Sequence, residues 1–140
     1  MASKHTYISH TADIAFDVEA DSIEELFIES FKGWLESVVE ITKFEPSDEI
    51  EIKLKSESLE QLLVDFLNEI NFLLTVKKVL CLEVKKIEVN ANEFLMRVLL
   101  GTVELNDNLI LKEEIKSVTY HQMEIKNENG KYFVRVVFDI

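Results

Sequence analysis

The chain has 140 residues, of which 47% are hydrophobic and 30% charged, with three Gly and one Pro; this describes one ordered domain, residues 1–140, with a single core. Its formal charge of −12 and the lack of a basic stripe predict no direct contact with nucleic acid. Without a membrane-length apolar run or a leader pattern, we expect a cytoplasmic protein with no membrane partner.

A polar turn near the N-terminus carries an imidazole and a carboxylate, His10 and Asp13. It lies between two strand-like segments, 5–9 and 14–18. In the second segment Ile14, Phe16 and Val18 share one face, which predicts a half-buried strand that begins just after the turn.

Two amphipathic helices are expected. The first spans residues 22–39 and begins with a capping box, Ser22 to Glu25, and its apolar stripe includes Trp34, a predicted core residue. An alternating strand, 49–55, precedes the second helix, which is capped by Ser58. The polar face of that helix carries Asp65, Asn68 and Glu69, whose spacing fits either simple solvation or a metal or acid/base group.

From Val79 onward the sequence is strand-like. The alternating apolar residues change from one face of the strand to the other across residues 85–86, which predicts a β-bulge. Residues 94–100 are predicted to form a central strand covered on both faces. Residues 114–125 form another expected strand, and 127–130 a hairpin turn into a central last strand. The expected fold is α+β, with six to eight mostly antiparallel strands and both helices on one face of the sheet.

The last two residues place the side chain of Asp139 beside the terminal α-carboxylate of Ile140. If the chain ends are neighbours in the fold, these groups and Asp13 form an all-oxygen cluster suited to a divalent cation such as Ca²⁺, Mg²⁺ or Mn²⁺. In the alternative reading, Asp13 caps a turn and Asp139 is a solvated last residue.

Other chemistry is sparse. The sequence lacks a Gly-rich phosphate loop and the zinc and serine-hydrolase motifs, and its single Cys81 reads as a buried hydrophobe. The candidate general bases are His10, His121 and Glu69, although an isolated histidine is usually structural. Lys116, on a half-apolar strand, is either solvated or binds an anion or a partner's carboxylate.

Taken together, these segments resemble the archease family over nearly the whole chain. The matching residues are 10–14 (HTADI), 24–27 (EELF), 62–69 (LLVDFLNE), 114–121 (EIKSVTYH) and 139–140 (DI). The chain departs from the usual family pattern at several places: Ala15 replaces Gly, Asn68 replaces Asp, the aromatic expected after Glu69 is not at its place, and the usual Gly-Glu pair is spread over residues 101–104. The departure at position 68 weakens any shared role for that position.

The resemblance implies a two-layer architecture with a forked sheet and a function as a non-catalytic activator of the RtcB-type RNA ligase in tRNA splicing. That ligase uses GTP and Mn²⁺ through a guanylylated histidine, and the activator would promote guanylylation and multiple turnover. The family's metal ligands correspond to Asp13, Asp139 and the carboxylate of Ile140, and Lys116 corresponds to a residue that matters for activation. His10, Glu69 and His121 are further candidates for activation or partner contact.

Two other functions stay open at this point. The same carboxylates could serve a free-standing metal-dependent phosphoesterase, or the chain could be a metal-free, chaperone-like binding module. A hydrolase would need a general base and usually more metal ligands than the sequence offers.

Overall fold

The computed structural model describes residues 3–8, 13–40 and 44–140. In these residues the helices are α1 (Ile23–Val38) and α2 (Leu59–Thr75). The strands are β1 (Lys4–Ile8), β2 (Asp13–Ala20), β3 (Val39–Glu40), β4 (Asp48–Lys55), β5 (Val79–Asn90), β6 (Leu95–Glu104), β7 (Ile110–Leu111), β8 (Ser117–Val118), β9 (Lys126–Glu128) and β10 (Lys131–Asp139).

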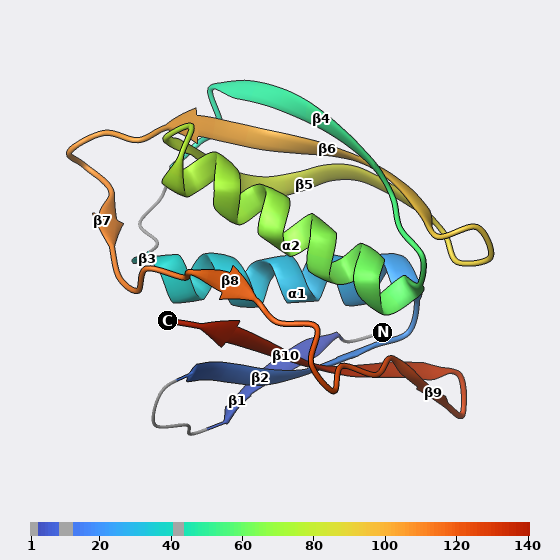
Figure 1. Ribbon diagram of the computed structural model, residues 1–140. Coiled ribbons are helices and arrows are strands. Elements are labelled where there is room, and N and C mark those ends of the chain that lie inside the picture. The colour runs from blue at the N-terminus through green and yellow to red at the C-terminus, as the bar shows by residue number, and fades with distance from the viewer. Residues whose placement is uncertain (1–2, 9–12, 41–43) are drawn as a thin grey trace.

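The strands form two larger sheets with the two helices between them (Figure 1). A five-stranded sheet has the order β1-β2-β10-β8, with β9 also paired to β10, and a three-stranded sheet has the order β4-β6-β5. All of the strand pairs in the described residues are antiparallel. Each sheet therefore carries the helices on one face, and the predicted α+β class is confirmed.

The described residues form more strands than the six to eight expected. The difference comes from β3, β7 and β8, which have two residues each, and from β9, which has three. Such short pairings arise where a loop runs briefly beside another strand, and alternation over two or three residues leaves no period to detect.

Both helices begin where their capping residues predicted. The hydroxyl of Ser22 accepts a hydrogen bond from the N–H of Glu25, and that of Ser58 accepts one from the N–H of Gln61. Each serine satisfies one of the donors that a helix start leaves without a partner in the helix. The two helices thus begin at Ile23 and Leu59.

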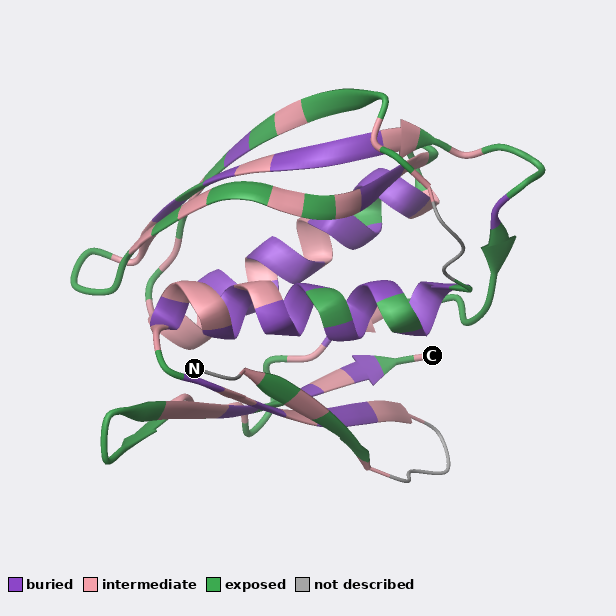
Figure 2. Cartoon of the chain, turned by 180° about the vertical axis from the view of Figure 1, so that it is seen from behind, coloured by how far each residue is buried: buried purple, intermediate pink, exposed green. Residues whose placement is uncertain are grey.

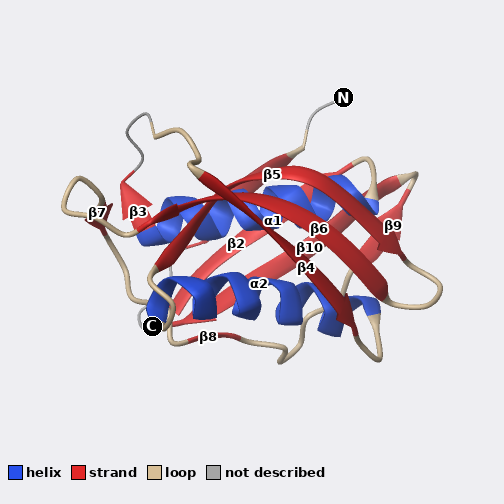
Figure 3. Cartoon of the chain, turned by 90° about the horizontal axis from the view of Figure 1, so that it is seen from above, coloured by secondary structure: helices blue, strands red, loops and turns tan. Residues whose placement is uncertain are grey.

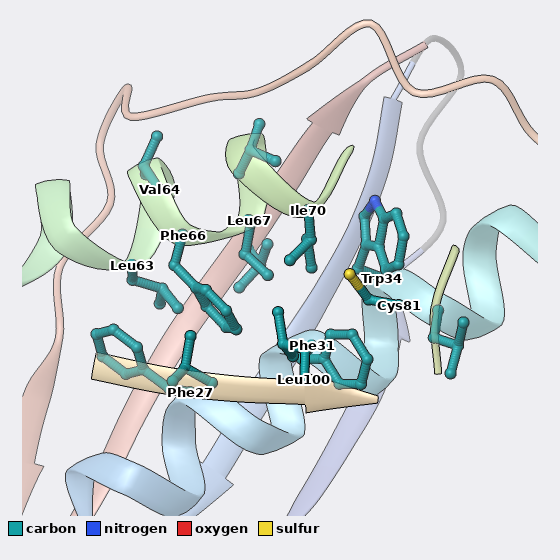
Figure 4. Close-up of a cluster of buried hydrophobic side chains, with 14 of the residues drawn as sticks. Phe27, Phe31, Trp34, Leu63, Val64, Phe66, Leu67, Ile70, Cys81 and Leu100 are labelled. Atoms are coloured by element: carbon teal, nitrogen blue, oxygen red, sulfur yellow. The ribbon is translucent and has the colours of Figure 1, made fainter. Parts of the chain in front are cut away.

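The core fills the space between the sheets (Figures 2 and 4). The rings of Phe27 and Phe66 stack with centroids 6.2 Å apart, which joins α1 to α2. Trp34 is fully buried, as predicted, and its indole Nε1–H donates to Asn71 Oδ1 at 3.0 Å. A buried Trp needs such a partner, because an unpaired N–H in the core is costly.

The predicted bulge is present. The pairing of β5 with β6 shifts register between Cys81 and Glu83 and again between Val84 and Lys86. The prediction that the β6 segment is central is also confirmed, but its outer face is open, because Arg97 is exposed and Leu95 and Leu99 are half-buried. Only the face toward the helices is covered.

The predicted strand at residues 114–125 is wrong except for β8. Side chains of α2, rather than a strand partner, bind much of this segment. Asn71 donates to the carbonyl of Ile115, and Glu60 accepts from the N–H of Ile125. A turn closed by Met123 N–H to Tyr120 O, with Gln122 at φ 58°, then interrupts the extended chain. The alternating pattern of the sequence does not reveal these tertiary bonds.

The hairpin into the last strand is as predicted. Asn129 and Gly130 both have positive φ, 54° and 82°, between β9 and β10. Two consecutive residues in that region give the turn whose twist matches paired antiparallel strands. It leads β10 into the five-stranded sheet, between β2 and β8.

Candidate functional site

The structure places the two predicted carboxylates at one end of the five-stranded sheet. Asp13 is the first residue of β2, Asp139 is the last of β10, and the two are Cα partners across the antiparallel pair. Directly opposed residues have their Cβ atoms about 4.5–5.5 Å apart and their side chains on one face. The predicted adjacency of Asp13 and Asp139 is therefore present in the backbone pairing.

The next strand continues this row. Asp139 is also the register partner of Ser117 in β8, and the N–H of Lys116 donates to the carbonyl of Asp139 at 2.8 Å. Lys116 is exposed, and its ammonium has no hydrogen-bond or ion-pair partner among the residues that the structure describes. We call Asp13, Asp139, Ile140 and Lys116 the carboxylate edge.

Two asparagines of α2 hold the segment that carries Lys116. Asn68 Oδ1 accepts from the N–H of Val118 at 2.8 Å, and Asn68 Nδ2 donates to the carbonyl of Val118 at 3.3 Å. Asn71 Nδ2 donates to the carbonyl of Ile115 at 2.8 Å. Lys116 thus lies between two main-chain groups that are fixed to the helix.

Asn71 also connects this segment to the core, because its Oδ1 accepts the bond from buried Trp34. Sequence reasoning gave Asn71 no role and treated Asn68 only as a weakened family position. An Asp at position 68 could accept from Val118 N–H but could not donate to its carbonyl. The available signal was a pair of amides at i and i+3 on the same side of a helix.

The other predicted residues lie on α2, in the turn after β8 or outside the described residues. Glu69 is half-buried on α2 beside Asn68, and His121 is exposed in the turn that follows β8. Asp65 is held by Ser56 Oγ and Gln61 Nε2, at 2.6 and 2.7 Å, so its role is structural. His10 lies outside the described residues.

The donor set of the carboxylate edge fits a hard cation, because every predicted ligand atom is a carboxylate oxygen. Over residues 3–8, 13–40 and 44–140, no group of three or more His, Cys, Asp or Glu side chains is arranged to hold a metal. Two Asp side chains alone fall short of such a group. The predicted third ligand, the carboxylate of Ile140, directly follows Asp139 in the chain.

A second charged cluster, which sequence reasoning missed, joins β1 to α1. The Nδ1 of His5 bonds Glu29, and its Nε2 bonds Glu36 Oε2 at 2.7 Å. Burial opposes the charged ring, but the bonds to Glu36 and Glu29 and their negative charges outweigh burial and raise the pKa of His5. Since the two carboxylates bind opposite ring nitrogens, they favour the charged form of the ring, and the three groups cannot chelate one metal together.

Cys81 is fully buried, and burial together with the charge of Glu69 raises the pKa of its thiol to about 12. A thiol that stays protonated is a poor nucleophile and metal ligand. The structure agrees with a packing role for this residue. No helix in the described part of the chain is both long and apolar enough to cross a membrane.

Fold and edge together define a small α+β protein in which the start of β2 and the end of β10 meet at the carboxylate edge. The model of the Archease protein family (MTH1598/TM1083) matches residues 5–140. This chain belongs to the archease family.

Curated relatives agree with this assignment. Protein archease of Methanopyrus kandleri is 33% identical over 135 residues, which cover 95% of this chain and 96% of the relative. Protein archease of Pyrococcus furiosus is 31% identical, with coverage of 96% of each chain.

Solved structures share the fold. The solution structure of Methanobacterium thermoautotrophicum protein 1598 superposes with a TM-score of 0.78 at 24% identity, covering 97% of this chain and 98% of that one. The crystal structure of an archease from Thermotoga maritima, described as a possible chaperone, gives 0.66 at 25% identity, with coverage of 95% and 94%.

Proposed function

We propose that this archease is an accessory activator of an RtcB-type RNA ligase in tRNA splicing, and that the carboxylate edge is the part that acts on the ligase. The observation that carries the proposal is the register of Asp13 against Asp139, with Lys116 bonded through its main chain to Asp139. This arrangement places two carboxylates and the main chain of Lys116 together at one end of a sheet.

Asp13, Asp139 and the carboxylate of Ile140 would hold a divalent cation, Ca²⁺, Mg²⁺ or Mn²⁺. When bound, such an ion supplies positive charge for phosphate oxygens, which phosphoryl and nucleotidyl transfer require. The protein itself orients the carboxylates, since the β2–β10 ladder fixes their main chains. Its proposed role is therefore positioning and charge rather than catalysis.

Lys116 would contact the ligase or its nucleotide. Its main chain is fixed between Ile115 and Val118, while its ammonium is exposed and has no partner in the described part of the chain. An ordered backbone under a solvated charge reduces the entropy lost when that charge docks. This is the chemistry expected of a contact residue rather than a stabilising one.

Guanylylation of the purified ligase by labelled GTP tests the proposal. Wild-type protein should increase the labelled fraction at limiting ligase, and Asp139→Asn should lose that effect. Asp107→Asn is the matched control, because Asp107 is exposed in the loop between β6 and β7. Equal stimulation by both variants would show that the carboxylate edge is not involved.

A metal-free, chaperone-like binding role is the second candidate. It is favoured by the description of the Thermotoga maritima archease as a possible chaperone and by exposed apolar side chains, among them Phe72 and Val76 at the end of α2. The two candidates differ in metal dependence. A chaperone of this kind would suppress ligase aggregation equally well with a chelator present and with Asp139→Asn.

A further inference from the structure

The outer face of the three-stranded sheet contains a shallow hollow of about 450 Å³ near the turn that joins β5 to β6. Its charged lining consists of Lys53, Lys55, Arg97 and Glu88. Three cations thus meet one anion in a protein whose formal charge is −12. We call these three cations, Lys53, Lys55 and Arg97, the basic row.

Strand register explains how the basic row forms. Lys53 of β4 and Arg97 of β6 are Cα partners, and Arg97 is in turn opposite Glu88 of β5. Lys55 follows two residues after Lys53 and so lies on the same face, about 7 Å further along the strand. Since Lys53 and Arg97 are distant in sequence, the chain shows no basic run, and the sequence alone predicts no nucleic-acid contact.

The cations of the basic row are weakly neutralised. Glu51 lies 3.7 Å from Lys53 and 3.8 Å from Arg97, beyond hydrogen-bond distance, and no carboxylate in the described residues pairs with Lys55. Exposed ion pairs at such distances contribute little free energy. The row therefore keeps donors for a further anion.

A second hollow, of about 470 Å³ on the outer face of the five-stranded sheet, makes the contrast clear. It also has three cations, but two of them, Arg135 and Lys4, have partners within hydrogen-bond or close ion-pair distance. Arg135 donates two bonds to Asp17, at 2.8 and 3.1 Å, Lys4 lies 3.3 Å from Glu19, and Lys126 lies 3.7 Å from Glu124. Its three cations face three anions, so of these two hollows the one at the basic row carries the net positive charge.

The negative charge of the rest of the molecule does not remove this local preference. At physiological ionic strength, exposed charges separated by more than about 8 Å are largely screened. A ligand at the basic row therefore interacts mainly with Lys53, Lys55, Arg97 and the two nearby glutamates.

We propose that the basic row contacts the phosphate backbone of single-stranded RNA, the substrate of the ligase, an inference that rests on the proposed function. The row lies near the β5–β6 turn, at the opposite end of the molecule from the C-terminus in two views (Figures 1 and 3). The carboxylate edge can then face the ligase while the outer sheet face stays open to an RNA end. A short, extended polyanion fits a shallow open row better than a folded ligand does.

Direct binding tests this contact without the ligase, so its failure is distinguishable from failure of ligase activation. Fluorescence anisotropy of a labelled oligouridine should show weak binding whose log Kd rises with log salt with a slope of about 2, as expected for three single-strand phosphates. The variant Lys53→Gln/Lys55→Gln/Arg97→Gln should weaken binding at least about tenfold, with an unchanged thermal midpoint.

The matched control is Lys32→Gln/Lys77→Gln/Lys131→Gln, which removes the same charge from exposed residues outside the basic row. It should bind RNA within about twofold of wild type, because distant charges are screened. Equal losses in the two triple variants would overturn the site, as would binding of neither RNA nor its competitor. Preferential binding of polyglutamate over oligouridine would overturn the assignment to RNA.

Discussion

Asn68 and Val118 are joined by two hydrogen bonds, one in each direction, across 50 residues of sequence. The side chain of Asn68 thereby takes the place of a neighbouring strand for the main chain of β8. Because a helix side chain bonds the edge of β8 that has no neighbouring strand in the described residues, this two-residue strand stays in register with Asp139.

Removal of this side chain should loosen the segment that carries Lys116. Asn68→Ala leaves the N–H and C=O of buried Val118 without the partners that Asn68 supplies, so we expect a loss of about 1–3 kcal/mol in the free energy of unfolding. Asn68→Asp keeps the acceptor but loses the donor and should give an intermediate loss. Urea unfolding measures both. An Ala variant as stable as wild type would contradict this role.

Gly33 tests the contact between α1 and β2. A Cβ at this position would lie 2.4 Å from Cε2 of Phe16, whose ring is fully buried. Although Ala favours a helix by about 1 kcal/mol over Gly, the clash should make Gly33→Ala destabilising by about 1–3 kcal/mol. Thermal unfolding measures the loss.

A double variant separates this clash from other effects. Phe16→Leu removes the ring edge, so Gly33→Ala should cost less in that background than in wild type. Additive losses in the two variants would show that the ring of Phe16 is not what excludes a Cβ at position 33.

His5 makes stability depend on pH with a defined sign. Its folded-state pKa lies above the ordinary 6.5, so its contribution is fully present below about pH 6.5 and is lost as the pH rises through the folded-state pKa. Wild type should therefore lose more stability than His5→Gln over that rise. Denaturant titrations at several pH values measure the difference.

An NMR titration of the ring checks the cause. Glu36→Gln removes the partner of Nε2 and should lower the pKa of His5 toward its ordinary value. A pH dependence that is the same in wild type and His5→Gln would contradict the role of this cluster.

Lys116 distinguishes a contact residue from a solvated one. Lys116→Ala should change the free energy of unfolding by no more than about 0.5 kcal/mol, because the side chain is exposed and its main chain keeps its bond to Asp139. Stimulation of the ligase should nevertheless fall. Partial activity of Lys116→Arg would indicate that charge matters more than the geometry of the ammonium group. A folded Ala variant with full stimulation would refute the assignment.

The sequence predicted the elements whose signals are local. Ser22 and Ser58 mark the helix starts, the Asn129–Gly130 turn marks the last hairpin, and parity across Lys85–Lys86 marks the bulge. Each depends on neighbours within a few residues.

The missed features depend on tertiary pairs. The bonds from Asn68 and Asn71 to the β8 segment, the His5 cluster and the basic row each join residues that lie far apart in the chain. The adjacency of Asp13 and Asp139 could be expressed only as a condition, since no local pattern specifies which strands pair.

The most direct test of the central claim is RNA ligation by the cognate RtcB-type ligase under multiple-turnover conditions, with substrate in excess. Addition of this protein should allow each ligase molecule to join many RNA pairs, and Asp139→Asn and Lys116→Ala should remove that gain while the matched Asp107→Asn variant keeps it. An unchanged yield of joined RNA with and without the wild-type protein would contradict the account.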